Sequence, residues 1–447
     1  MSDRVARFGG VSDRWDREQV LGLAPDTASA KAAEGVAKPA KWGAAGCDDD
    51  ALWGECRGSG KNPYRACVDL SEPAFRCSCP SRKFPCKHAL GLLLLWSEGT
   101  VDAGPRPAWA AEWIEERRAR ADRARERRAG AAAKARDPRT VERREQRVDG
   151  GVAELDQWLR DQVTHGLAQA EQASYRLWDD VARRLVDAQA AGLAGQVRAL
   201  AAVPRRPGWP GRLLEEYALL RLLVRAYRRR DGLPEGLRET VRSRVGFTVQ
   251  QEEVVREGER VRDLWCVTGS RDIAQDQLTT RRVWLRGRRS GRPALVLSFA
   301  VPGRPLDASL VVGTEVDAEL AFYPGSQPLR AVVAERYGAA TPAVPDGSPV
   351  AAFLDEYAAA LERDPWLDRW PAVLSDVRPA RPPGERNGTW NLQVVDAEGD
   401  ALPLLPTDPW RLLAASGGRP VTVAGEWTPR GMRPLALWSE DEGVCIL

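Results

Sequence analysis

The chain has 447 residues, enough for roughly two to four domains. Hydrophobic residues make up 43%, which is ordinary for a globular protein. The formal net charge is only +3, which excludes a polycation that attracts nucleic acid through its overall field. Any basic binding surface must therefore be local.

The basic residues are strongly skewed, because seven of the 66 are lysines and the other 59 are arginines. This skew is typical of a GC-rich bacterial genome. The first ten residues, MSDRVARFGG, contain no apolar segment like that of a secretion signal. The apolar run Leu92–Trp96 is far too short to span a membrane. We expect a soluble cytoplasmic protein without a membrane partner, in which clustered cysteines hold metal more often than disulfides.

Residues 1–45 form an N-terminal segment with short helices. Asp26 is a suitable N-cap for a helix that continues to Ala37, because its carboxylate can accept a free first-turn N–H. Residues 46–99 form a compact unit with two strands, at 52–58 and 63–70, and a third extended piece at 74–77. A helix is predicted over 86–97. We expect its leucines and Trp96 to pack on side chains from the strands, namely Trp53, Tyr64, Val68 and Phe75.

The next two regions are predicted to be helical. Residues 100–150 comprise a linker and a segment rich in Arg, Glu and Ala, which we interpret as a solvated helix or a flexible basic arm. Residues 151–247 carry apolar side chains at helical spacing and form a helical domain, which prolines between 204 and 210 divide.

Residues 248–447 form a β-rich region, because the apolar period changes from helical to two after Phe247. A hairpin is predicted at 281–301, with further strands at 306–312 and 314–323 and a final β block at 390–438. One inserted helix is expected near 349–363. An OB-like barrel is one interpretation of this region. Five tryptophans are predicted to lie in the core: Trp265, Trp284, Trp390, Trp427 and Trp438.

One motif carries specific chemistry. Cys77, Cys79, Cys86 and His88 have the spacing C-x-C-x6-C-x-H. Three thiolates and one imidazole complete a tetrahedral Zn²⁺ shell, as in structural rather than catalytic sites. The chain has only two histidines, and one falls beside three cysteines within twelve residues. The sequence therefore predicts one structural Zn²⁺ per chain.

The motif resembles that of the SWIM zinc-finger family, in which a C-x-C pair is followed, after a variable gap, by C-x-H. All four ligand positions match, and the surroundings match too, since a β-hairpin precedes the finger and an apolar helix follows it. The resemblance implies a ββα finger over roughly residues 50–98 that binds DNA or protein. It also implies a protein partner such as an AAA ATPase or a von Willebrand factor A type protein, to which some bacterial members are linked.

Four basic residues close to the motif are the candidates for partner contact: Arg76, Arg82, Lys83 and Lys87. Such cations suit phosphate contacts, which weaken with salt. Acidic residues nearby, among them Asp48, Asp69 and Glu72, offset part of their field. The leading hypothesis is a structural module that binds protein or nucleic-acid partners. The alternative is a direct DNA- or RNA-binding protein that uses these basic residues.

A catalytic function has little support in the sequence, because no common hydrolase, metalloprotease or kinase motif occurs. His165 is the only histidine outside the zinc motif, and no nucleophile is evident beside it. We therefore predict a non-enzymatic protein with no catalytic residues, and keep an enzyme in the C-terminal region as a further alternative. The sequence as a whole predicts an α+β multidomain fold, with an N-terminal finger, a helical middle and a β-rich C-terminal region.

Overall fold

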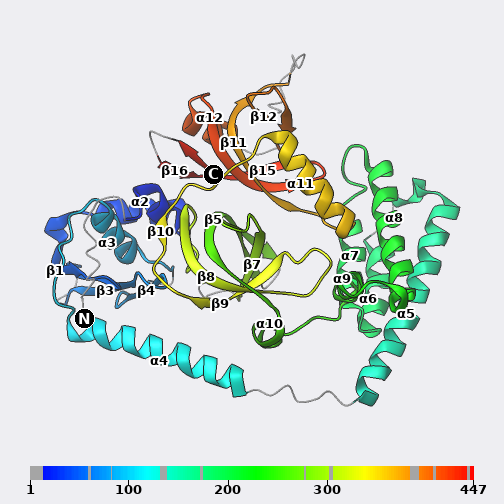
Figure 1. The fold of residues 1–447 in the computed structure, drawn as a ribbon, viewed down its shortest axis with the longest axis horizontal. Coiled ribbons are helices and arrows are strands. Elements are labelled where there is room, and N and C mark those ends of the chain that lie inside the picture. Colours follow the sequence, from blue (N-terminus) through cyan, green and yellow to red (C-terminus); the bar gives the residue numbers. More distant parts are fainter. Residues whose placement is uncertain are drawn as a thin grey trace.

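The computed structural model describes residues 14–58, 62–81, 83–130, 138–171, 175–275, 278–301, 306–382, 392–405, 409–439 and 443–447. Within these ranges the chain forms twelve α-helices, one four-stranded sheet and two six-stranded sheets. The four-stranded sheet lies near the N-terminus, the helices gather in the middle, and the larger sheets follow (Figure 1). The predicted α+β class and its order of regions are confirmed.

The N-terminal region contains the two predicted strands and the predicted helix, together with one additional strand. Its elements are α1 (Arg17–Gly22), α2 (Thr27–Val36), β1 (Trp42–Cys47), β2 (Ala51–Cys56), β3 (Tyr64–Asp69), β4 (Ala74–Cys77) and α3 (Lys87–Ser97). The sheet is an antiparallel meander in the order β1-β2-β3-β4. Strand β1, with the sequence WGAAGC, has no alternation of apolar and polar residues and was therefore not predicted.

Helix α3 is buried on all sides, from His88 to Trp96. One side packs on the sheet, where Val68 and Phe75 share its core, and α2 covers another side. The predicted packing is wrong for Trp53. This side chain lies on the opposite face of the sheet, against Ala110 and Ile114. Side chains alternate between the two faces of a strand, so β2 packs against α3 on one face and against the helix that begins at Ala108 on the other.

Two long helices follow the finger, at residues 108–130 and 138–165. Helix α4 (Ala108–Gly130) begins against the finger and runs along the bottom of the molecule (Figure 1). Helix α5 (Pro138–His165) continues across residue 150, where the sequence placed a boundary between two regions. This correction has a packing cause, since Val148, Val152 and Leu155 are buried in one continuous stripe.

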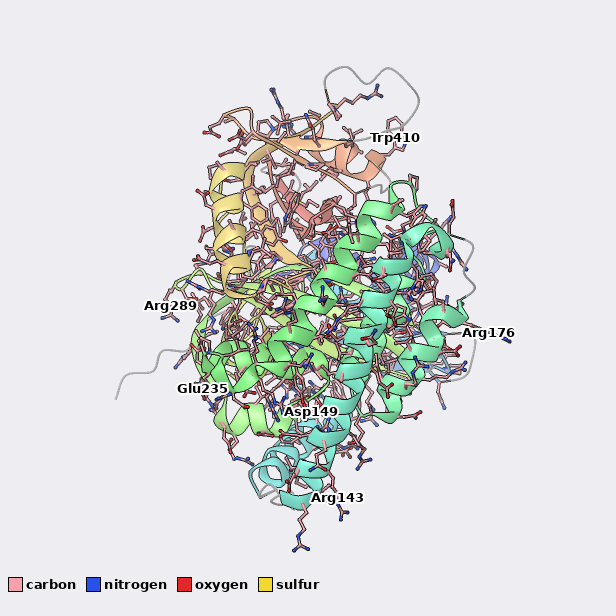
Figure 2. The ribbon with its side chains drawn as sticks, turned by 90° about the vertical axis from the view of Figure 1, so that its right-hand side faces the viewer. Arg143, Asp149, Arg176, Glu235, Arg289 and Trp410 are labelled. Atoms are coloured by element: carbon pink, nitrogen blue, oxygen red, sulfur yellow. The ribbon has the colours of Figure 1, made fainter. Side chains whose placement is uncertain are left out.

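The helical domain consists of α5, α6 (Arg176–Asp187), α7 (Ala191–Leu200), α8 (Trp209–Arg228) and α9 (Glu235–Val245). Figure 2 looks onto this bundle, with Arg143 and Asp149 on α5 and Arg176 on α6 labelled. The indole of Trp366, from the β-rich region, enters the core of the bundle and donates a hydrogen bond to the carbonyl of Leu219 at 3.0 Å. Trp366 therefore connects the β-rich region to the apolar core of the bundle.

The first large sheet closes into a barrel. Its strands are β5 (Glu259–Gln275), β6 (Leu278–Gly287), β7 (Pro293–Ala300), β8 (Thr314–Phe322) and β9 (Arg330–Arg336), with the short β10 (Thr341–Pro342) beside β8. The path β5-β6-β7-β9-β8 returns to β5, and only the β7–β9 pair is parallel. This Greek-key order is that of a five-stranded OB-type barrel.

The second large sheet repeats this order. Its strands are β11 (Trp370–Ala380), β12 (Gln393–Val395), β13 (Ala401–Pro403), β14 (Val421–Thr428) and β15 (Gly431–Ser439), with β16 (Gly443–Ile446) beside β15. A parallel bridge from Leu404, just after β13, to Met432 in β15 closes the path β11-β12-β13-β15-β14. Each barrel follows a helix, α10 (Gln251–Glu257) or α11 (Val350–Arg363). The C-terminal region is thus two barrels with one topology.

Three sequence predictions in this region need correction or fall outside the structure. Residues 306–312 are not a strand, because they connect β7 to β8 with turns. The inserted helix near 349–363 is present as α11, but it is not alone, since α10 and α12 (Pro409–Ser416) also lie in the region. Four of the five tryptophans are buried, and Trp390 lies outside the described residues. No helix in the described ranges is both long and apolar enough to cross a membrane.

Candidate metal centre

The metal-binding residues lie where β4 ends and α3 begins. Cys77 is the last residue of β4, Cys79 follows in the turn, Cys86 is the N-cap of α3, and His88 is in its first turn. Because His88 lies two residues after the N-cap, the start of the helix presents its thiol and its imidazole together. The local fold therefore brings both ligand pairs to one place.

The four side chains form one compact cluster. Their ligand atoms all lie within 4.8 Å of one another, and Cys77 Sγ is 3.8 Å from His88 Nδ1. Zinc–sulfur and zinc–nitrogen bonds of about 2.3 and 2.0 Å in a tetrahedron place neighbouring donors roughly 3.5–4 Å apart. The cluster thus has the donor types and the spacing of a tetrahedral zinc shell. Cys86 and His88 are buried, while Cys77 and Cys79 are half-buried.

Neighbouring groups hold the cluster in place. Ser78, between the first two cysteines, accepts a hydrogen bond from the Arg65 amide at 2.9 Å and donates its own amide to the Arg65 carbonyl at 3.0 Å. These bonds fix the turn between Cys77 and Cys79 to β3. The Tyr64 ring lies 4.9 Å from the His88 ring at an angle of 33°, and so restrains the orientation of the imidazole.

The electrostatics favour a thiolate at Cys86. The Cys77 thiol donates a hydrogen bond to Cys86, which holds the pKa of Cys86 well below its ordinary value and raises the pKa of Cys77. The Ala89 amide also lowers the pKa of Cys86, since it lies in the first turn of α3, where free N–H groups stabilise a negative charge. A thiolate is the form that a metal ion binds.

No second cluster of this kind exists among the described residues. Cys47, Cys56 and Cys67 lie near the finger, but each is buried as a free thiol in apolar surroundings. Burial raises the pKa of Cys67 to about 12, so this thiol stays protonated at neutral pH. These three cysteines pack in the core as small apolar side chains.

The predicted partner-binding residues are not equally available. Arg76 and Lys87 are exposed on β4 and at the start of α3. Lys83 forms an ion pair with Asp26 at 2.6 Å, and this pair lowers the pKa of Asp26 to about 2. Arg82 lies outside the described residues. The structure therefore brings Lys83 to the N-terminus of α2, a contact that no local pattern predicts.

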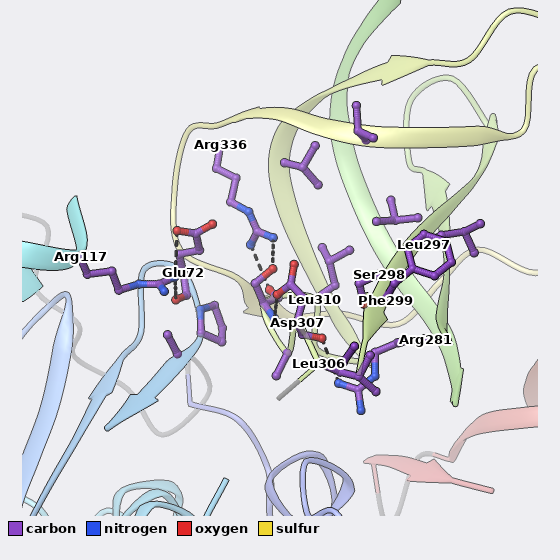
Figure 3. A pocket seen from close by; sticks show the side chains of 18 of the residues that line it. Glu72, Arg117, Arg281, Leu297, Ser298, Phe299, Leu306, Asp307, Leu310 and Arg336 are labelled. Atoms are coloured by element: carbon purple, nitrogen blue, oxygen red, sulfur yellow. Dashed lines mark hydrogen bonds and ion pairs between the residues drawn. The ribbon is translucent and has the colours of Figure 1, made fainter. Parts of the chain in front are cut away.

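A groove of about 1840 Å³ lies between the finger and the first barrel, and no local sequence pattern predicts it. Its walls come from segments more than 200 residues apart in the chain (Figure 3). Arg117 from α4 binds the Glu72 carboxylate at 2.9 Å on one side, and Arg281 donates to the Asp307 carbonyl at 3.0 Å on the other. Among the described residues, eight basic and eight acidic side chains line the groove, so their formal charges cancel.

The first barrel opens into this groove. Strand β7 pairs with β9 at only two positions, which involve Leu295 and Val296, and the strands then separate. Beyond that point one edge of β7 faces the groove, together with Ser298 and Phe299 (Figure 3). The Ser298 hydroxyl is buried and has no hydrogen-bond partner among the described residues, while Phe299 and Val301 are each 52% exposed. The groove thus combines an open strand edge with exposed apolar side chains.

Comparison with known protein families matches residues 67–96 to the SWIM zinc finger and residues 143–245 to the SWIM-associated four-helix bundle domain. The first match contains all four clustered residues, and the second covers most of the bundle formed by α5 to α9. Neither curated proteins nor solved structures yield a match. The chain therefore carries a SWIM zinc finger and its associated helical domain, which confirms the family resemblance read from the sequence.

Proposed function

We propose that this SWIM zinc-finger chain is a non-enzymatic binding scaffold in which one structural zinc ion holds the finger together. The observation that carries this proposal is the cluster of Cys77, Cys79, Cys86 and His88 at the junction of β4 and α3. When bound, zinc would cross-link a strand end to a helix start. Four protein donors fill a tetrahedral shell and leave no position for a substrate, as in structural sites.

We further propose that the groove between the finger and the first barrel binds a protein segment in an extended conformation. The formal charges of its described lining residues cancel, which gives little attraction for a phosphate backbone. The free edge of β7 can pair with an added strand, and Phe299 and Val301 can cover apolar side chains of that strand. Family resemblance suggests an AAA ATPase or a von Willebrand factor A type protein as the partner.

Binding of the zinc-loaded chain to such purified proteins from the same organism, after nuclease treatment, tests this proposal. We expect Phe299→Glu to weaken binding at least tenfold, because a carboxylate would have to be buried against the added strand. Val344→Glu is the matched control, since Val344 is 57% exposed and does not line the groove. Equal loss with both variants, or none with Phe299→Glu, would refute the groove as the binding site.

Nucleic-acid binding is the second candidate function, and the strand order of the two barrels favours it. Barrels of this topology often bind oligonucleotides, and Arg76 and Lys87 are exposed beside the finger. Fluorescence anisotropy of labelled DNA and RNA, titrated with salt, tests this candidate. Binding that falls steeply with salt and is lost in an Arg76→Gln, Lys87→Gln double variant would favour it over the protein-binding scaffold.

A further inference from the structure

Three arginines contact one buried carboxylate where the two barrels meet, and a fourth lies opposite it on the neighbouring strand. Glu426 in β14 is almost inaccessible, with 1% of its side chain exposed. Arg369 donates to its Oε1 at 2.8 Å, and Arg271 from the first barrel approaches the same atom at 3.5 Å. Arg282, also from the first barrel, lies 3.6 Å from Oε2. Arg433 pairs with Glu426 in the β14–β15 register.

The charges in this cluster do not balance. The second acidic group in contact is Asp368, which accepts from Arg369 at 2.9 Å but is 68% exposed. Among the described residues, four positive charges thus lie near two negative charges, and of the two acids only Glu426 is buried. The side chains of Arg271, Arg282 and Arg369 are 23–34% exposed, so they are partly removed from water while remaining accessible to a small solute.

Two of the guanidinium groups have a buried donor atom that makes no hydrogen bond. Nη1 of Arg282 forms only an ion pair with Glu426 Oε2 at 3.6 Å, and Nε of Arg433 has no hydrogen-bond partner among the described residues. Burial lowers the pKa of both arginines, and the nearby Arg369 and Arg271 lower it further. A buried donor that loses water without gaining an acceptor is costly, and an added anion would satisfy both its charge and its hydrogen bonds.

A second cluster of arginines around a buried carboxylate lies in the helical bundle, and it differs from the cluster between the barrels. Asp156 is surrounded by Arg160, Arg221 and Arg228, but their side chains are 46–56% exposed. The buried atom without a hydrogen bond there is an acceptor, Oδ1 of Asp156, and Arg221 Nε already forms an ion pair with it at 3.5 Å. In the cluster between the barrels, by contrast, the buried atoms without a hydrogen bond are donors.

We propose that the barrel junction formed by Arg271, Arg282, Arg369 and Arg433 binds a phosphate group. Planar guanidinium groups match the geometry of phosphate oxygens, and the surplus of two positive charges suits a phosphate dianion or a phosphodiester chain. The phosphate can belong to a small ligand or to the backbone of a single-stranded nucleic acid. This site goes beyond the protein-binding scaffold proposed above and does not depend on zinc.

Calorimetry of the full zinc-loaded chain with pyrophosphate, at matched ionic strength in sodium chloride, tests the site. We expect saturable binding that Arg433→Gln weakens at least tenfold, while Arg433→Lys retains part of the affinity. Arg221→Gln, at the cluster around Asp156, is the matched control and should bind like the wild type. Absence of pyrophosphate binding, or equal weakening by Arg433→Gln and Arg221→Gln, would overturn the proposal.

Glu426→Gln gives an independent test, because it removes the one buried negative charge and leaves the arginines in place. We expect its melting temperature to rise more with pyrophosphate than that of the wild type, since the ligand would replace the missing charge. An equal rise in both proteins would count against the site. A labelled single-stranded oligonucleotide then distinguishes the sources: competition by pyrophosphate indicates a backbone phosphate, and pyrophosphate binding alone indicates a small ligand.

Discussion

Individual residues decide the chemistry of the finger. Cys86 has a double role, because its thiol is one of the four clustered donors and its backbone begins α3. The thiol lies at the positive end of a helix whose other residues are mainly apolar and buried. Loss of this one sulfur therefore affects both the metal and the attachment of α3 to the sheet.

We predict that Cys86→Ser lowers the zinc content from about one ion per chain to near zero, because structural zinc needs all of its protein donors. Hydrogen exchange should become fast over residues 42–97, while α5 to α9 and the barrels stay protected, because metal binding supplies much of the folding free energy of a small finger. Metal analysis and exchange mass spectrometry measure both effects. Cys445→Ser, in β16, should keep its zinc; normal zinc in Cys86→Ser would contradict the assignment.

Asp263 is a second residue whose side chain makes several hydrogen bonds. Its buried carboxylate accepts hydrogen bonds from the amides of Arg289 and Ser290, at 3.0 and 2.9 Å, and from the Ser290 hydroxyl at 2.7 Å. Burial alone would raise the pKa of Asp263, but these bonds outweigh it and the pKa lies below its ordinary value. The carboxylate thus fixes the turn between β6 and β7.

We predict that Asp263→Asn lowers the free energy of unfolding at pH 7 by about 2 kcal/mol, because amide donors lose a charged acceptor. A lowered pKa stabilises the fold above the ordinary pKa of an aspartate, and this contribution is lost as the pH falls through the folded value. The difference between wild type and variant should therefore shrink below about pH 4. Denaturant titrations at pH 7 and pH 3 test this; a difference that grows at pH 3 would contradict it.

At the scale of secondary-structure elements, the packing between helices decides which side chains fit at a given position. Gly91, in the middle of α3, lies against α2 so closely that a Cβ atom there would be 2.6 Å from Val36 Cγ2 and 3.1 Å from the Ala33 carbonyl oxygen. Gly195 in α7 has no atom within 4 Å of such a Cβ. The two glycines thus have the same helical setting and different surroundings.

We predict opposite effects of alanine at these positions. Gly195→Ala should raise the free energy of unfolding by about 0.5–1 kcal/mol, because alanine favours a helix over glycine. Gly91→Ala should lower it by about 1–3 kcal/mol, since overpacking against α2 exceeds that gain. Denaturant unfolding of the zinc-loaded variants measures both. Stabilisation by Gly91→Ala would show that α2 can move away from α3 at little cost.

The whole molecule depends on a few contacts between its regions. Trp366 joins the helical domain to the second barrel through its burial in the bundle core and its bond to Leu219. Arg244 and Asp364 form an ion pair beside it at 2.8 Å. The finger is joined to the rest in a similar way, since Gln19 of α1 donates to the Gly313 carbonyl at 2.8 Å. These contacts connect regions that are far apart in sequence.

We predict that Trp366→Ala separates the unfolding of the helical domain from that of the barrels. Removal of a buried tryptophan costs about 3–5 kcal/mol, and here the loss falls at the boundary between two regions. Calorimetry should then show a new transition at lower temperature. Trp410→Ala is the control, because Trp410 is 58% exposed and its loss should change stability by less than about 0.5 kcal/mol. A single unchanged transition in Trp366→Ala would indicate that other contacts hold the regions together.

Local patterns in the sequence determined the order of regions, the elements of the finger and the four clustered donors. Ligand spacing and apolar period are properties of short segments, so Cys77, Cys79, Cys86 and His88 could be predicted together. The same holds for α11 and for the β6–β7 hairpin, which the structure contains. Strand β1 could not be predicted because its sequence, WGAAGC, does not alternate apolar and polar residues. The continuity of α5 could not be predicted because its packing partners, α6 and α8, lie further along the chain.

Only the tertiary structure decided how distant segments meet. The closure of both barrels depends on pairs such as β7 with β9, which no local pattern specifies. The groove joins residues near 72 to residues near 300, and the arginine cluster joins residue 271 to residue 433. An arginine-rich composition does not indicate which guanidinium groups become buried, because burial depends on contacts between segments that are far apart in the sequence.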